Sequence, residues 1–148
     1  MSDTRTRILV VCPGRGSYGR DTLHSLRPTP SVRVADAFRA ALGRPTPTEM
    51  DAAEAISSKL HVAGENASIL TMACSLADAD ALAPRNGGGA DGIEVVAVVG
   101  NSMGWYTALA VAGALGLEDA LRLVETMGQY QAANVVGGQL LYPLVDGE

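Results

Sequence analysis

Aromatic residues, cysteines and histidines are scarce in this sequence of 148 residues. Only 4% of it is aromatic, with one tryptophan, two cysteines and two histidines. Cys12 and Cys74 lie too far apart in the sequence to indicate a disulfide framework or a metal site. No apolar stretch is long enough to span a bilayer, and the first residues do not form a signal sequence. Aromatic residues do not alternate with basic ones, a pattern typical of nucleic-acid binding. We therefore expect a cytoplasmic protein that binds neither membrane nor nucleic acid and needs no metal or organic cofactor.

The sequence contains two short apolar runs. Arg7–Cys12 and Ile93–Val99 are apolar almost throughout rather than alternating, which predicts parallel strands buried on both faces. With 47% hydrophobic residues, the chain can form one α/β domain. Ligands bind at the carboxyl ends of such strands, so we expect the loop after the first run, Pro13–Ser17, to face the turn after the second.

That second turn carries the most informative motif, Gly100-Asn101-Ser102-Met103-Gly104, ahead of a helical stretch at 105–109. Strand, G-x-S-x-G turn and helix together predict a nucleophile elbow, in which a strained backbone exposes the serine hydroxyl. The first amides of the helix would then stabilise an oxyanion. The alternative is a tight turn whose small residues serve only packing.

The loop Pro13-Gly14-Arg15-Gly16-Ser17 has two interpretations of its own. It can supply a second backbone donor to the serine site, or it can bind phosphate, as many glycine-rich turns do after a first strand. It lacks the full G-x-G-x-x-G spacing and a Walker lysine, and both absences argue against nucleotide binding.

Helices are predicted between the two strands. One covers 32–42 and ends at Gly43. Thr48 with Asp51 predicts a capping box for a second helix reaching about Leu60, and a longer helix covers 67–82.

These motifs together resemble the malonyl-CoA:acyl-carrier-protein transacylase family and the acyltransferase domains of fatty-acid and polyketide synthases. The resemblance rests on three segments in this order: Cys12-Pro13-Gly14-Arg15-Gly16-Ser17, Gly100-Asn101-Ser102-Met103-Gly104-Trp105-Tyr106-Thr107-Ala108-Leu109, and the stretch from Ala112 to Val124. It runs from about Ile8 to the C-terminus and covers only the first part of the family's fold. That fold is a parallel sheet flanked by helices, the acyltransferase large subdomain, which would here occupy residues 1–136.

The resemblance also implies roles for individual residues. Ser102 would be the nucleophile, the amides of Met103 and Arg15 would form the oxyanion hole, and the remaining positions would line the substrate pocket: Gly14, Gly16, Asn101, Trp105 and Met127. Several positions depart from the family pattern: Asn101 replaces a histidine, Trp105 a glutamate and Arg15 a glutamine.

Met127 is the departure that bears on the substrate. It falls where the family has the arginine that binds a malonyl carboxylate. Methionine cannot form charge-assisted hydrogen bonds, so we expect a neutral acyl group to be preferred over malonyl.

The family's general base is a histidine far downstream of the serine, beyond a ferredoxin-like small subdomain whose first strand residues 137–148 resemble. His24 and His61 are more typical of surface or capping positions, with His24 the better candidate for the base. A serine without a base is a weak nucleophile. We therefore expect a fragment, half of a split enzyme or an inactive relative, with a second polypeptide or a C-terminal continuation supplying the histidine.

The expected function is transfer of an acyl group from a coenzyme A thioester, through a serine ester, to the thiol of an acyl carrier protein. Two alternatives stay open: thioester hydrolysis on the same fold, and a non-catalytic carrier-binding or assembly subunit. An α/β-hydrolase fits less well, because only one clear strand precedes the elbow strand. Eight arginines lie within the first 44 residues of a chain whose net charge is −5. They form either a face for an acidic carrier or coenzyme A phosphates, or a solvated helix surface.

Overall fold

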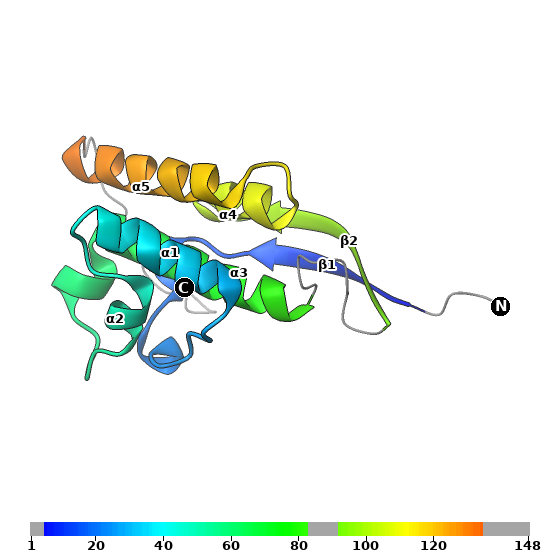
Figure 1. Cartoon of the computed structure of the whole chain (residues 1–148), viewed down its shortest axis with the longest axis horizontal. Coiled ribbons are helices and arrows are strands. Elements are labelled where there is room, and N and C mark those ends of the chain that lie inside the picture. The colour runs from blue at the N-terminus through cyan, green and yellow to red at the C-terminus, as the bar shows by residue number, and fades with distance from the viewer. Residues whose placement is uncertain (1–4, 83–91, 135–148) are drawn as a thin grey trace, which may run out of the picture.

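The protein is a mixed α/β structure of one parallel sheet and several helices. The computed structural model describes residues 5–82 and 92–134. The elements in chain order are β1 (Thr6–Cys12), η1 (Arg15–Ser17), η2 (Arg20–Thr22), α1 (Pro30–Ala41), α2 (Pro47–Asp51), η3 (Ser58–Val62), α3 (Gly64–Leu82), β2 (Ile93–Gly100), α4 (Gly104–Val111) and α5 (Leu117–Ala133). Figure 1 shows both strands running toward the helices, with α4 and α5 on one side and α1 and α3 on the other.

The two strands pair in parallel, as the apolar runs predict. Thr6 lies opposite Ile93 at one end and Cys12 opposite Gly100 at the other. The register shifts between Ile8 and Leu9. Because the paired strands end together, the segments that follow them leave the sheet side by side.

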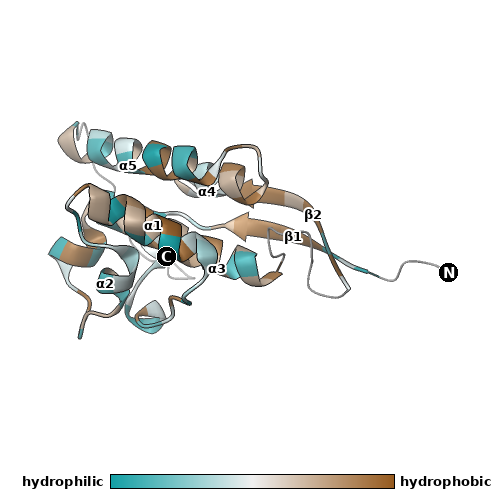
Figure 2. Cartoon of the chain, in the orientation of Figure 1, coloured by the Kyte–Doolittle hydropathy of each residue, from teal (hydrophilic) through white to brown (hydrophobic). Residues whose placement is uncertain are grey.

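The prediction that both faces of these strands are buried is wrong for the described part of the chain. Leu9 is 54% exposed, Val11 61% and Val96 43%. Ile8 and Val10, on the opposite face of β1, are half-buried. Figure 2 shows that the strands are hydrophobic along much of their length. The described helices shield only one face of the sheet. The prediction failed because a continuous apolar run indicates that a strand is to be buried without indicating which element buries it.

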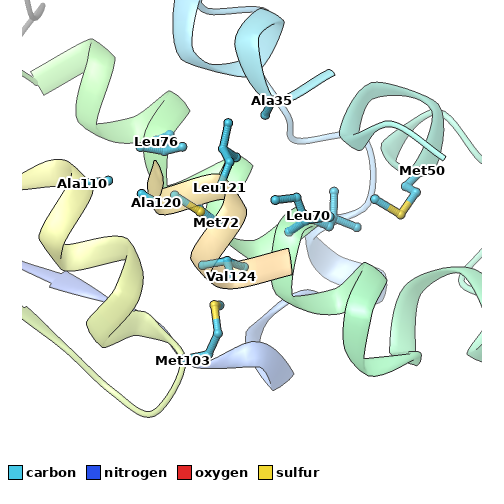
Figure 3. Packing of buried hydrophobic residues seen from close by; sticks show 11 residues of the cluster. Ala35, Met50, Leu70, Met72, Leu76, Met103, Ala110, Ala120, Leu121 and Val124 are labelled. Carbon is cyan, nitrogen blue, oxygen red and sulfur yellow. The ribbon is translucent and has the colours of Figure 1, made fainter. Parts of the chain in front are cut away.

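The core lies between the helices (Figure 3). Leu70, Met72 and Leu76 of α3 pack with Leu121 and Val124 of α5, and none of them exposes measurable surface. α3 also contacts α1, α2 and α4. It is therefore buried over most of its length, which explains why it lacks a clear polar face.

Two helix predictions have different outcomes. α1 covers nearly the predicted range, and Thr29 caps it by accepting a hydrogen bond from the N–H of Val32. The helix predicted from Thr48 to Leu60 is wrong, because α2 ends at Asp51 and a separate π-helical turn follows at Ser58–Val62.

The capping box at the start of α2 is also displaced from its predicted position. It is formed by Thr46 and Glu49, with Pro47 at the start of the helix, rather than by Thr48 and Asp51. The carboxylate of Asp51 instead accepts hydrogen bonds from the hydroxyl of Tyr18 and the N–H of Leu26. A tertiary contact thus occupies the side chain that the local pattern assigned to a cap.

A buried ion pair joins α1 to α5. The Nη1 of Arg39 lies 2.7 Å from a carboxylate oxygen of Glu125, and both side chains are almost fully buried. Arg44 approaches the other oxygen of Glu125 at 2.8 Å and Glu65 of α3 at 2.9 Å. This network fixes three helices relative to one another.

Two further predictions concern the extent of the chain. The beginning of a small subdomain, predicted at 137–148, lies outside the described residues. Within residues 5–82 and 92–134, no helix has both the length and the apolar character needed to cross a membrane.

Candidate functional site

Ser102 occupies the sharp turn between β2 and α4. Its φ angle is +53°, in the left-handed region that non-glycine residues rarely adopt. The turn is closed by hydrogen bonds from the N–H of Gly104 to the carbonyl of Asn101 (2.8 Å) and from the N–H of Trp105 to the carbonyl of Ser102 (3.1 Å). Such strain costs on the order of 1–3 kcal/mol and concentrates at functional sites. This is the conformation that a nucleophile elbow requires.

The two glycines of the motif are required by close backbone contacts. A Cβ built on Gly100 would lie 2.3 Å from the backbone of Gly104, and a Cβ on Gly104 would lie 2.1 Å from the carbonyl oxygen of Cys12. The first contact shows that the turn folds back onto the end of β2. The second shows that the start of α4 packs directly on the end of β1. No side chain fits at either position.

The loop after β1 faces Ser102, as predicted. A Cβ on Gly14 would lie 3.3 Å from the carbonyl oxygen of Asn101 and 3.5 Å from the Cβ of Ser102. The hydroxyl of Ser17 donates to the carbonyl of Gly14 (2.8 Å) and so closes the loop on itself. Gly16, by contrast, has open space around its Cα, so its absent side chain is not required for packing.

Two backbone donors close to the serine have no partner in the described part of the chain. The N–H groups of Met103 and Arg15 donate to none of residues 5–82 and 92–134. The Met103 side chain is 9% exposed and packs in the core below Val124 (Figure 3). The hydroxyl of Thr71 donates to the carbonyl of Arg15 at 3.5 Å and ties the loop to α3. Neither N–H group is therefore committed to an acceptor within the described residues.

The other predicted pocket residues lie on the elbow and on two helices. Asn101 is exposed within the elbow, and Trp105 is 56% exposed on the first turn of α4. Met127 is half-buried on α5, and its neighbour Gly128 packs against the backbone of Gly64 and Glu65 at the start of α3.

Neither described histidine is bonded to Ser102. His61 is 2% exposed, so the surface alternative predicted for it is wrong, whereas its ring bonds to backbone groups at the end of α2 and the start of η3 agree with the capping alternative. Its Nδ1 accepts from the N–H of Ser57 (3.0 Å), and its Nε2 lies 2.8 Å from the carbonyl of Met50. Nε2 therefore carries the proton, and neither ring nitrogen is free to act as a base.

His24 is exposed and has a φ angle of +67°. The hydroxyl of Tyr18 donates to the carboxylate of Asp51. Burial, followed by the hydrogen bond to Asp51, raises the pKa of the Tyr18 hydroxyl, so this group stays protonated.

Both thiols are poor nucleophiles. Burial raises the pKa of Cys12, which is 1% exposed. Burial, together with the charges of Asp51 and Asp78, raises the pKa of Cys74 to about 12. Because the thiolate is the reactive form, burial lowers the reactivity of both thiols relative to an exposed cysteine.

A groove of about 490 Å³ opens beside the Pro13–Ser17 loop. Arg15 and Tyr18 line it from the loop side, His61 and Gly64 from the segment leading into α3, and Gln131 from the end of α5. The sequence-based prediction did not place the last three of these residues in a common site. Gln131 lies far along the chain from His61 and Gly64, and no local pattern relates it to them.

Among residues 5–82 and 92–134, no group of three or more histidine, cysteine or acidic side chains is placed to hold a metal ion. Comparisons with protein-family models, with curated proteins and with solved structures found no match to this chain.

Proposed function

We propose that this chain is the large part of an acyltransferase that moves an acyl group from acyl-CoA to the thiol of an acyl carrier protein. The observation that carries the proposal is the left-handed conformation of Ser102 at the junction of β2 and α4. The Gly14 loop against the serine and the two unpartnered N–H groups give it further support. In this reading the sheet and helices form the acyltransferase large subdomain, and the protein acts in the cytoplasm.

The reaction proceeds in two displacements at the same carbonyl carbon. The Ser102 oxygen attacks the thioester carbonyl, and its proton passes to a histidine. The N–H groups of Met103 and Arg15 stabilise the resulting oxyanion. The C–S bond then breaks, and the coenzyme A sulfur takes the proton from the histidine. In the second displacement, the histidine deprotonates the carrier thiol, which attacks the serine ester and restores the Ser102 hydroxyl.

We expect the histidine to lie outside the described residues, because His61 has both ring nitrogens engaged and no hydrogen bond joins the exposed His24 to Ser102 within residues 5–82 and 92–134. We propose that a second polypeptide, or a continuation of the chain, supplies it within hydrogen-bond reach of Ser102. Residues 1–148 expressed alone should then be inactive or prone to aggregation. Full turnover by a stable monomer would contradict this, and His24→Ala would be the next variant to test.

Labelling of Ser102 tests the proposed function directly. We expect the complete protein, incubated with short acyl-CoA, to gain one acyl mass on the peptide that contains Ser102. Ser102→Ala should abolish the label, and Ser58→Ala, the same change at an exposed serine of η3, should retain it. Label on Cys12, or no label with any acyl-CoA, would argue against catalysis through Ser102.

The nature of the acyl group is proposed from position 127. Methionine there supplies no charge-assisted hydrogen bond, and losing such a bond costs on the order of 1.5–3 kcal/mol. Acetyl-CoA should therefore label Ser102 at least about tenfold faster than malonyl-CoA in direct competition. A clear malonyl preference would mean that another cation binds the carboxylate.

A non-catalytic carrier-binding or assembly subunit is the second candidate, and the absence of a base beside Ser102 in the described residues favours it. Carrier binding without Ser102 labelling would identify it. Thioester hydrolysis would give the same serine ester with water as the acceptor, and analysis of the products separates hydrolysis from transfer.

A further inference from the structure

The backbone of Arg15 is part of the Pro13–Ser17 loop, which faces the serine turn. Its side chain lines the neighbouring groove. A Cβ built on Gly64 would lie 2.6 Å from Nη1 of Arg15, so the guanidinium lies directly against the start of α3. Arg15 and Gln131 line the same groove. The groove therefore carries a cation near one end and can draw on an amide from the last turns of α5.

The charge of this guanidinium is not balanced within the described part of the chain. The neighbouring carboxylates are already paired: Glu65 with Arg44 at 2.9 Å, and Glu125 with Arg39 at 2.7 Å and Arg44 at 2.8 Å. No ion pair joins Arg15 to any of residues 5–82 and 92–134. A half-exposed guanidinium beside a groove suits a planar or tetrahedral anion, because its parallel N–H groups match the oxygens of carboxylate and phosphate.

The guanidinium of Arg15 is connected to the serine site through the adjacent residue, Gly14. Gly14 packs against Ser102, and the next residue extends its side chain into the groove. A substrate whose carbonyl sits at Ser102 therefore has a cation within reach along the loop.

We infer that Arg15, assisted by Gln131, binds an anionic oxygen group of the thioester substrate. The group is either a carboxylate at the far end of the acyl chain or a phosphate of the coenzyme A or carrier arm. The inference rests on the proposed function, since it takes the ligand at Ser102 to be a thioester. If the anion is an acyl carboxylate, Arg15 replaces the cation that is missing at Met127, and the expected preference for neutral acyl groups is reversed.

The test compares four substrates: butyryl-CoA, succinyl-CoA and the two corresponding thioesters of N-acetylcysteamine, which carry no phosphate. The rate of acylation of Ser102 is followed by intact mass in the full protein with every polypeptide that co-purifies. The variants are Arg15→Gln, Arg15→Lys and Gln131→Ala. Arg122→Gln serves as the control, because Arg122 is an exposed cation of α5 that does not line the groove.

A carboxylate ligand predicts that Arg15→Gln slows both succinyl thioesters at least about tenfold more than the two butyryl thioesters. A phosphate ligand predicts that it slows both coenzyme A substrates and neither N-acetylcysteamine thioester. In either case Gln131→Ala should give a smaller loss in the same substrates, Arg15→Lys should retain part of the rate, and Arg122→Gln should have no effect.

Labelling of Ser102 that is insensitive to Arg15→Gln, or slowed equally for all four substrates, overturns the inference while leaving the proposed function intact. If no thioester labels Ser102, the proposed function fails. Calorimetric binding of succinyl-CoA and butyryl-CoA to the unmodified protein and to Arg15→Gln then decides the anion site, and equal affinities in the two proteins overturn it.

Discussion

Gly104 lies so close to Cys12 that a Cβ on the glycine would sit 2.1 Å from the cysteine's carbonyl oxygen. This contact presses the first turn of α4 onto the end of β1. The same segment is held to the strand by a 3.0 Å hydrogen bond from the N–H of Asn101 to that carbonyl. The serine turn is thus held against the end of β1, which lies about ninety residues earlier in the chain. Local sequence patterns do not encode a contact over such a separation.

Gly104→Ala should destabilise the protein, because the clashing atom belongs to backbone and cannot rotate away. We expect a loss of at least about 2 kcal/mol in the free energy of unfolding, measured by urea denaturation. Gly16→Ala is the matched control, since nothing lies within 4 Å of its added Cβ. A Gly104→Ala protein as stable as Gly16→Ala would show that α4 does not approach β1 this closely.

Ser102→Gly should be more stable than Ser102→Ala, because glycine adopts a φ of +53° without the strain that any Cβ introduces. We expect a difference of about 1 kcal/mol in the free energy of unfolding. At Asn101, whose φ is not positive, the order should reverse, with glycine less stable than alanine. Equal stability of the two Ser102 variants would mean that this turn is not strained.

Arg39→Met should destabilise the protein by about 3 kcal/mol or more, because it removes the closest cation from the buried carboxylate of Glu125. Arg27→Met is the control, since its ion pair with Asp78 is exposed and should contribute less than about 1 kcal/mol. The double variant Arg39→Met with Glu125→Leu should recover part of the loss, because it also removes the buried carboxylate that Arg39→Met leaves with Arg44 as its one cation. Strictly additive losses would contradict coupling between the two residues.

The open face of the sheet should mediate association. Leu9→Thr combined with Val11→Thr removes two exposed apolar side chains while keeping strand propensity. We expect this double variant to sediment at a lower average mass than the wild type at equal concentration when purified alone. Leu42→Thr, a similarly exposed leucine at the end of α1, should leave the mass unchanged. Unchanged association in the double variant would place the contact elsewhere.

The candidate site was predictable where its signals are local. The glycines at 100 and 104 are needed because the backbone turns sharply around Ser102, and the apolar runs before each loop indicate parallel strands. The capping of α2 was not predictable in this way, because Thr46 and Thr48 are both plausible caps. The choice depends on Asp51, which is engaged by Tyr18 from a distant part of the chain.

By itself, then, the sequence determined the two strands and the serine turn, since hydrophobic periodicity and glycine positions act over a few residues. That the Gly14 loop faces the serine followed from a general rule of parallel sheets, in which the carboxyl ends of the strands meet at one edge. The tertiary structure alone decided that His61 is buried with both nitrogens engaged and that Arg39 pairs with Glu125. It also decided that the guanidinium of Arg15 lies against Gly64. A charged or polar side chain finds its partner by long-range packing, and the free energy of burying it depends on that partner, which no spacing in the chain specifies.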